Sequence, residues 1–224
     1  MSDAVKEAVT RRKLERYMEL LTSQNEELNL TAIDDPAEIW VRHFEDSAQL
    51  LTLYNFAGAR VLDLGSGAGF PGIPLRMGEP KINLTLLDAT DKKVEFLRFV
   101  CDELELDGVA CVHGRAELLS RVDGWRNGFD YVVTRGVSRL NILCELALPL
   151  LRIGGKLLAM KGVECHNEVV QAGNAISTLR GQLENVHRYT LSSGRLNAVV
   201  AIRKTDLTPA AYPRRYSRIK AKPL

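Results

Sequence analysis

A short apolar run that breaks into a glycine-rich loop is the feature that most restricts how this chain can fold. Residues 61–64 form the apolar run and are predicted to be a buried strand. The loop that follows holds four glycines within eight residues: Gly65, Gly67, Gly69 and Gly72. Glycines let the backbone bend tightly and approach a ligand with no Cβ in the way. Residues 73–77 then begin a helix, and strand, loop and helix together predict a nucleotide-sized site at the carboxyl edge of a parallel sheet.

The glycine loop fits two cofactor patterns. Residues 67–72, Gly-Ala-Gly-Phe-Pro-Gly, match the dinucleotide fingerprint G-x-G-x-x-G. Residues 65–69, Gly-Ser-Gly-Ala-Gly, match the G-x-G-x-G of enzymes that use S-adenosyl-L-methionine (SAM). The second frame begins where the strand ends, and it places Asp63 where class I methyltransferases usually have an acidic residue. We therefore favour SAM. A loop that binds nothing is disfavoured, because each glycine lowers stability unless the backbone needs it.

Strands and helices alternate along most of the chain. Apolar runs predict further strands at residues 82–88, 109–112, 129–134, 156–160, 188–192 and 196–203. Periodicity and cap patterns predict helices over 4–24, from Asp35 to near Gly58, and over 91–104, 138–151 and 164–184. The last two strands have no helix between them and must pair antiparallel. We predict an α/β, Rossmann-like fold of the class I SAM-dependent methyltransferase type. Its seven-stranded sheet is mostly parallel, with an antiparallel last strand and an N-terminal helical extension.

Two further segments are candidates for holding the cofactor. Asp88 ends the second predicted strand, 19 residues after Gly69, which is about the spacing at which an acid accepts hydrogen bonds from ribose hydroxyls. A helix cap is the alternative, although Thr90 or Asp91 can already serve that helix end. The loop after the third strand holds adenine in such folds, so Ala116 and Glu117 are candidates. The start of a surface helix remains equally open for these two residues.

The end of the fourth strand carries information about the acceptor. Residues 134–137, Thr-Arg-Gly-Val, lack the Asn/Asp-Pro-Pro-Tyr typical of exocyclic-amine methylation. They also lack the Pro-Cys or Thr-Cys nucleophile that methylation of pyrimidine carbon 5 requires. A nucleophile that needs no deprotonation remains, such as guanine N7, for which alignment and water exclusion do most of the work. Arg135 is a candidate to bind a carboxylate or a guanine edge, with a surface ion pair as the alternative. Lys161 ends the fifth strand near the same edge.

The charge of the chain is concentrated at its C-terminal end. The whole chain has 30 basic and 28 acidic residues, but residues 212–224 contain five basic residues and no acidic one: Arg214, Arg215, Arg218, Lys220 and Lys222. The pattern divides the chain into a helical cap (1–58), a SAM-binding core (59–204) and a basic tail (205–224). A basic tail with two tyrosines suits a phosphate backbone with some base stacking, and a solvated, disordered tail is the alternative. Five phosphate contacts predict a salt slope of roughly −3.5 on single-stranded RNA.

Several classes of protein are disfavoured by composition. No stretch approaches the ~20 apolar residues that span a membrane, and the N-terminus lacks an apolar signal segment. The four cysteines are widely spaced without a C-x-x-C pair, so zinc, redox and disulfide functions have little support. The four histidines are equally scattered. We expect no metal, a cytoplasmic location, and a monomer because nothing demands more.

The motifs together are similar to one family. They are Asn29-Leu30-Thr31, Arg42-His43 with Asp46-Ser47, residues 63–75, Leu87-Asp88 followed by Lys92-Lys93, Arg135-Gly136-Val137, Lys161-Gly162 and the basic tail. On these residues the chain resembles the bacterial 16S rRNA guanine-N7 methyltransferases, also called glucose-inhibited division protein B. The resemblance covers nearly the whole chain. Its Gly-Phe-Pro-Gly-Ile-Pro segment is far more specific than a glycine loop alone.

The resemblance implies SAM as methyl donor and, as target, N7 of a guanine in the 530 loop of 16S rRNA of the small ribosomal subunit. Carried over by position, the expected cofactor contacts are Gly65, Phe70, Asp88, Ala89, Thr90, Ala116, Glu117 and Arg135, to which the loop residues Ser66, Gly67 and Gly69 are added. Two departures are small: Ala89-Thr90 stands where the family often has Ser-Leu, and Gly136 where it often has Ala.

The combined hypothesis is an rRNA guanine-N7 methyltransferase. Arg135 and Lys161 are the candidates for positioning substrate or methionine. The basic tail, with a rim formed by Asn29 and His43, would hold RNA. Three alternatives are a methyltransferase for another RNA or a small molecule, a nicotinamide-dependent oxidoreductase that uses residues 67–72, and a non-catalytic RNA-binding module. The closing strand pair speaks against the oxidoreductase, and turnover separates the enzyme from the binding module.

Overall fold

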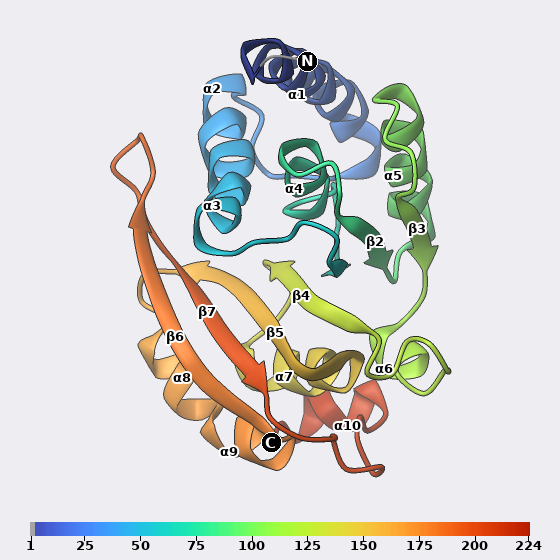
Figure 1. The fold of residues 1–224 in the computed structure, drawn as a ribbon, viewed down its shortest axis with the longest axis vertical. Coiled ribbons are helices and arrows are strands. Elements are labelled where there is room, and N and C mark those ends of the chain that lie inside the picture. Colours follow the sequence, from blue (N-terminus) through green and yellow to red (C-terminus); the bar gives the residue numbers. More distant parts are fainter. Residues whose placement is uncertain (1–2) are drawn as a thin grey trace.

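A seven-stranded sheet runs through the molecule in the order β3-β2-β1-β4-β5-β7-β6 (Figure 1). The computed structural model describes residues 3–224, with side chains from residue 10 onward. The strands are β1 (Arg60–Leu64), β2 (Asn83–Asp88), β3 (Ala110–His113), β4 (Phe129–Arg135), β5 (Leu151–Gly162), β6 (Gly181–Thr190) and β7 (Leu196–Lys204). Only β7 runs antiparallel to its neighbours, whereas the other pairs are parallel. The predicted fold class is confirmed.

Helices cover both faces of the sheet (Figure 1). They are α1 (Asp3–Leu28), α2 (Pro36–Ile39), α3 (Asp46–Leu53), α4 (Gly72–Gly78), α5 (Asp91–Glu103), α6 (Ala116–Leu119), α7 (Leu140–Ala147), α8 (His166–Gln171), α9 (Gly173–Thr178) and α10 (Tyr216–Ala221). One apolar core joins α1 to α5 with the sheet, and a second joins α6 to α10 with the opposite face. Among the described residues, no helix is both long and apolar enough to cross a bilayer.

The N-terminal helices form as their sequence predicts, with one irregularity. Tyr17 and Leu21, on the apolar side of α1, are fully buried. Asp35 caps α2 by accepting a hydrogen bond from the backbone nitrogen of Glu38 at 2.8 Å. A π-helical turn, Trp40–Glu45, then joins α2 to α3. Such turns frequently lie at functional sites, and this one carries two residues of the site described below.

Three predicted helices end earlier than expected, and the strands predicted over 156–160 and 188–192 begin earlier, as β5 at Leu151 and β6 at Gly181. The helix after Asp35 ends at Leu53, before Gly58. The helix expected over 138–151 ends at Ala147, because Pro149 supplies no amide hydrogen for a further turn. The element expected as a helix over 164–184 is two short helices ending at Thr178, followed by β6 from Gly181. There the left-handed backbone of Arg180, with φ of +63°, ends the helix and turns the chain into the sheet.

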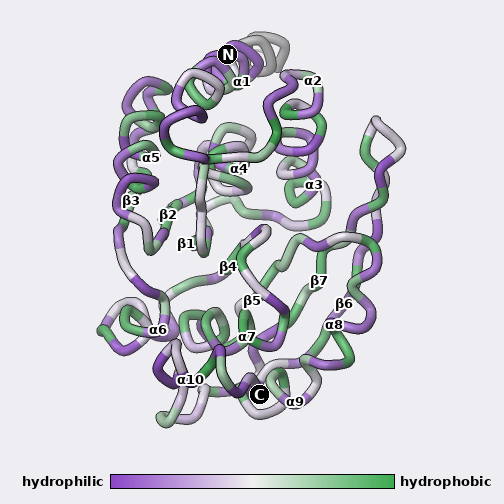
Figure 2. The backbone as a smooth tube through the Cα atoms, turned by 180° about the vertical axis from the view of Figure 1, so that it is seen from behind, coloured by the Kyte–Doolittle hydropathy of each residue, from purple (hydrophilic) through white to green (hydrophobic). Residues whose placement is uncertain are grey.

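The last strand pair shows how the sheet ends. The central residues of β7, Ala198–Ile202, are buried and hydrophobic, whereas β6 is mostly exposed and mixes polar with apolar residues (Figure 2). This is the expected composition of a protected edge strand, because charged side chains hinder pairing with another chain.

The C-terminal segment is ordered against the core. Residues 216–221 form α10, which packs on α7 and buries Ile219 completely. The alternative of a disordered tail is therefore wrong for this segment.

Candidate active site

The glycine loop lies at the carboxyl ends of β1, β2 and β4, where its backbone favours glycine at three positions. Gly65, Gly67 and Gly69 have φ values of +70°, +56° and +100°, which L side chains rarely adopt. A Cβ on Gly65 would also lie 2.5 Å from Cγ2 of Val137. The loop can therefore present its backbone closely to a ligand, as the sequence predicts.

Two buried carboxylates hold this loop in place. Asp88 accepts hydrogen bonds from the backbone nitrogens of Gly67 and Thr90, each at 2.9 Å. Asp63 accepts one from the backbone nitrogen of Gly72 at 2.8 Å, while its Oδ1 atom has no partner. Burial raises the pKa of Asp63 to about 7. The acid at the end of β1 therefore fixes the start of α4 from inside the protein.

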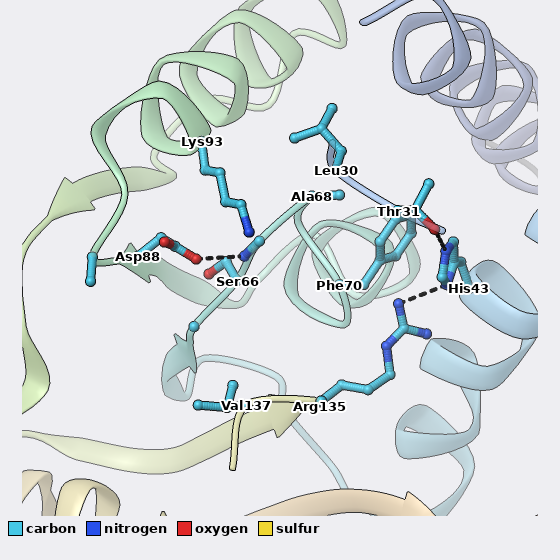
Figure 3. A pocket seen from close by; sticks show the side chains of 14 residues that line it. Leu30, Thr31, His43, Ser66, Ala68, Phe70, Asp88, Lys93, Arg135 and Val137 are labelled. Carbon is cyan, nitrogen blue, oxygen red and sulfur yellow. Dashed lines mark hydrogen bonds between the residues drawn. The ribbon is translucent and has the colours of Figure 1, made fainter. Parts of the chain in front are cut away.

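Most of the residues predicted to bind the cofactor line two adjoining cavities. The first, of about 370 Å³, lies over the loop and is lined by Gly65, Ser66, Gly67, Phe70, Asp88, Ala89 and Arg135, among others (Figure 3). The second, of about 160 Å³, shares Gly65, Asp88 and Ala89 and extends to Ala116 and Glu117. Gly69 and Thr90 line neither cavity. At Gly69 the loop faces the protein interior, where an added Cβ would collide with the Tyr17 hydroxyl. Thr90 donates a hydrogen bond from its backbone nitrogen to Asp88.

Arg135, at the end of β4, connects the loop to the N-terminal helices (Figure 3). Its guanidinium donates to the backbone oxygen of Arg42 at 2.8 Å and lies 2.9 Å from Nδ1 of His43. It also lies 3.4 Å from a carboxylate oxygen of Asp46 and 5.0 Å from the centre of the Phe70 ring. Arg135 is mostly buried in these contacts, so the alternative of a surface ion pair does not describe it.

His43 is held as a neutral ring in this arrangement. It stacks on Phe70 with ring centres 4.6 Å apart, and its Nε2 atom lies 2.9 Å from the Thr31 hydroxyl. Burial and the charge of Arg135 lower the pKa of His43 to about 3. The neutral ring therefore accepts from Arg135 at Nδ1 and donates to Thr31 from Nε2.

Tyr189 and Asn197 belong to this network and were not predicted from the sequence. Asp46 accepts hydrogen bonds from the hydroxyl of Tyr189 at 2.7 Å and the amide of Asn197 at 2.8 Å. Both partners come from the β6–β7 pair, more than 140 positions away in the chain. No local pattern marks them. Only the pairing of β6 with β7 in this topology brings them to Asp46.

A third cavity, also of about 370 Å³, adjoins this network on the side of β5 and β7. Arg42, His43, Asp46, Arg135 and Lys161 line it, together with Gly136, Met160, Gly162, Arg195 and Asn197. The Lys161 ammonium donates to Glu168 and to the backbone oxygen of Ser138, each at 2.7 Å. Glu168 in turn accepts from the amide of Leu140 at 3.1 Å. Lys161 thus orders the segment that leads into α7 at the rim of the cavity.

The residues predicted to bind RNA fall into different environments. Asn29 is exposed and ends α1 with φ of +49°, outside the three cavities above. Arg215, Arg218, Lys220 and Lys222 are exposed on the C-terminal segment. Arg214 instead binds the fully buried Glu145, with Nη2 2.6 Å from Oε2. Its charge is therefore already neutralised within the protein.

The residues of the first two cavities fit SAM. The missing Cβ atoms of the loop leave its backbone open, Asp88 presents a carboxylate beside it, and the second cavity has an apolar lining suited to a purine. Among residues 10–224, whose side chains the structure describes, no group of three or more histidine, cysteine, aspartate or glutamate residues is arranged to hold a metal ion. The sheet order, the glycine loop and these cavities define a class I SAM-dependent methyltransferase.

Solved structures share this fold. TrmN from Thermus thermophilus superimposes with a TM-score of 0.56 at 19% identity, covering 73% of this chain and 53% of that one. A SAM-dependent methyltransferase from Aquifex aeolicus gives 0.56 at 17% identity, covering 77% and 96%. At these identities the likeness concerns the fold.

The family follows from sequence comparison. A family model described as "GidB: rRNA small subunit methyltransferase G" matches residues 10–196. Ribosomal RNA small subunit methyltransferase G of Caldanaerobacter subterraneus is 42% identical over 212 residues, covering 94% of this chain and 88% of that protein. That of Streptococcus pneumoniae strain G54 is 37% identical, covering 100% and 93%. The chain belongs to the rRNA small subunit methyltransferase G family. The predicted resemblance and the SAM-dependent methyltransferase class are confirmed.

Proposed function

We propose that the protein transfers the methyl group of SAM to N7 of a guanine in the 530 loop of 16S rRNA. The support from the structure is the chemistry of the third cavity, which we call the acceptor cavity. Nδ1 of His43 is engaged by Arg135, and both Asp46 oxygens are engaged by Arg135, Tyr189 and Asn197. These groups are poorly placed to remove a proton. Guanine N7 has an in-plane lone pair and loses no proton when it is methylated, so it suits such a cavity.

The residues of the chain then act by binding and alignment. SAM, when bound, supplies a methyl group on a positively charged sulfur. The loop backbone at Gly65 to Gly67 would hold its methionine part, Asp88 its ribose, and the cavity at Ala116 and Glu117 its adenine. Alignment of a nucleophile and exclusion of water can supply several kcal/mol of the barrier, about 7–11 at best.

Arg135 and Lys161 would position the acceptor. Arg135 lines both the cofactor cavity and the acceptor cavity, and it ties the π-helical turn to β4. Lys161 holds the rim through Glu168 and Ser138. The target base must leave its stack to reach this depth, as in other enzymes that modify bases.

The exposed cations of the C-terminal segment would bind the RNA backbone, with His43 lining the site and Asn29 exposed beyond it at the end of α1. Because Glu145 holds Arg214, four cations remain: Arg215, Arg218, Lys220 and Lys222. Replacing all four with alanine should make the salt slope of single-stranded RNA binding shallower by roughly 2.8. Filter binding at several salt concentrations measures it, and an unchanged slope would remove the segment from the RNA surface. We further propose that the protein is a cytoplasmic monomer that acts on the small ribosomal subunit.

The proposed reaction is tested by transfer of labelled methyl from SAM to undermethylated 30S subunits and to protein-free 16S rRNA. Label released as 7-methylguanine from either substrate supports the proposal, and the preferred substrate shows whether ribosomal proteins shape the site. If neither takes label while SAM binds, the rRNA target is wrong. A small-molecule acceptor or a non-catalytic role in RNA binding would then be the better supported hypothesis.

A further inference from the structure

One residue that lines the second cavity, Tyr216, comes from the C-terminal segment of the chain. Tyr216, the first residue of α10, lines this cavity together with Ala116 and Glu117 from α6 and Val137 and Leu146 from around α7. The guanidinium of Arg115, the residue before α6, lies 5.8 Å from the centre of the Tyr216 ring. A tyrosine ring therefore lies at the edge of the cavity that is proposed to hold the adenine of SAM.

Tyr216 is fixed there by an anchor two residues before it. Glu145 on α7 is fully buried and accepts three hydrogen bonds from Arg214: from the backbone nitrogen at 2.8 Å, from Nε at 2.8 Å and from Nη2 at 2.6 Å. On the other side of Tyr216, Ile219 is fully buried against the same core. Charge-assisted bonds to a buried carboxylate hold geometry strongly, so the ring does not depend on a mobile tail.

We propose that residues 212–221 form the outer wall of the adenine site and that Tyr216 contacts the adenine of SAM. This inference rests on SAM as the cofactor, and it deepens the proposed function by giving the C-terminal segment a role in cofactor binding besides RNA binding. An aromatic ring suits this place, since stacked or edge contacts between rings are favourable beyond the area they bury. The Glu145–Arg214 pair is the positioning device for the ring.

Calorimetric binding of S-adenosylhomocysteine to the full chain tests the contact. Tyr216→Ala should raise the Kd roughly tenfold, the size expected when one aromatic contact is lost. Tyr216→Phe keeps the ring and should stay within about twofold of the wild type. Ser217→Ala, an exposed neighbour on the same helix, is the matched control. Equal Kd values for wild type and Tyr216→Ala would overturn the proposal, as would equal weakening by Phe and Ala.

A second measurement on the unmodified protein avoids any folding defect of the variants. Amide hydrogen exchange of residues 212–221 should slow when S-adenosylhomocysteine is added, along with that of residues 65–70 and 114–117. Slower amide exchange in residues 65–70 without any change in residues 212–221 would contradict the proposal that residues 212–221 form a wall of the adenine site. If Asp88→Ala also left the Kd unchanged, the cofactor assignment itself would fail, and that result is distinct from a failure of Tyr216 alone.

Discussion

The carboxyl edge of the sheet has two halves that are built in different ways. On the cofactor half, the loop is held by Asp63 and Asp88, whose partners lie at most 21 positions away in the chain. On the half that we propose holds the methyl acceptor, called the acceptor half below, Asp46 contacts Arg135, Tyr189 and Asn197 from 89, 143 and 151 positions away. A site made of neighbours leaves a motif in the sequence. A site assembled by topology leaves almost none.

The largest effect is expected on the cofactor half. Asp88→Ala removes the acceptor for the amides of Gly67 and Thr90 and the proposed ribose contact. Hydrogen bonds to a charged group contribute roughly 1.5–3 kcal/mol each, so the Kd for SAM should rise roughly a hundredfold. Isothermal calorimetry measures it. RNA affinity is the internal control and should stay the same, whereas joint loss of both would show that the halves are not separate.

A matching change on the acceptor half should leave SAM binding intact. Arg135→Lys keeps the charge but loses the planar fork that reaches both Arg42 and His43. We expect kcat to fall roughly thirtyfold through lost alignment. The Kd for SAM should stay within about twofold of the wild type, because lysine keeps the positive charge that Arg135 places beside the cofactor cavity. Steady-state kinetics with rRNA gives the first value and calorimetry the second. A large rise in the Kd alone would move Arg135 to the cofactor half.

The buried acid of the cofactor half should make stability depend on pH. The pKa of Asp63 is about 7 in the folded protein and 3.8 without burial. The folded state therefore keeps a proton that the unfolded chain releases, and this stabilisation is complete below pH 3.8 and lost as pH rises through 7. Asp63→Asn cannot titrate. The unfolding free energy of the wild type minus that of the variant should fall by on the order of 4 kcal/mol between pH 4 and 8.

Urea unfolding at several pH values checks the Asp63 prediction. The opposite pH dependence from His43, whose lowered pKa favours the folded state as pH rises from 3 to 6.5, is present in both proteins and cancels in the difference. A difference that is constant with pH would show that Asp63 is ionised in the fold.

The smallest effect is expected for a change in the Asp46 network of the acceptor half. Tyr189→Phe removes one of the two bonds to Asp46 Oδ1 and leaves the amide of Asn197 in place. The unfolding free energy should fall by about 1 kcal/mol, and kcat should drop with little change in the Kd for SAM. Thermal unfolding and kinetics measure the two. Unchanged kcat would confine the Asp46 network to stability.

Sequence reasoning anticipated the parts whose conformation is written locally. The glycine loop, the sheet with its antiparallel strand and the cap at Asp35 each follow from residue types within a few positions. The π-helical turn at Trp40–Glu45 has no comparable residue pattern. Tyr189 and Asn197 became visible only in the fold, because tertiary contacts place them. Tyr216 belongs to the tail that the sequence assigns to RNA, and only its position beside the second cavity suggests a contact with the cofactor. Charge alone predicts that all five cations of the tail are available to RNA, whereas the buried partner Glu145 holds Arg214 against the protein.

The most direct test of the two-half account is methyl transfer to 30S subunits at increasing SAM by Asp88→Ala and Arg135→Lys. We expect saturating SAM to restore Asp88→Ala to near the wild-type rate, because its defect is cofactor affinity. Arg135→Lys should stay slow at every SAM concentration, because its defect is alignment of the acceptor. Restoration of Arg135→Lys by SAM, or failure to restore Asp88→Ala, would contradict the account.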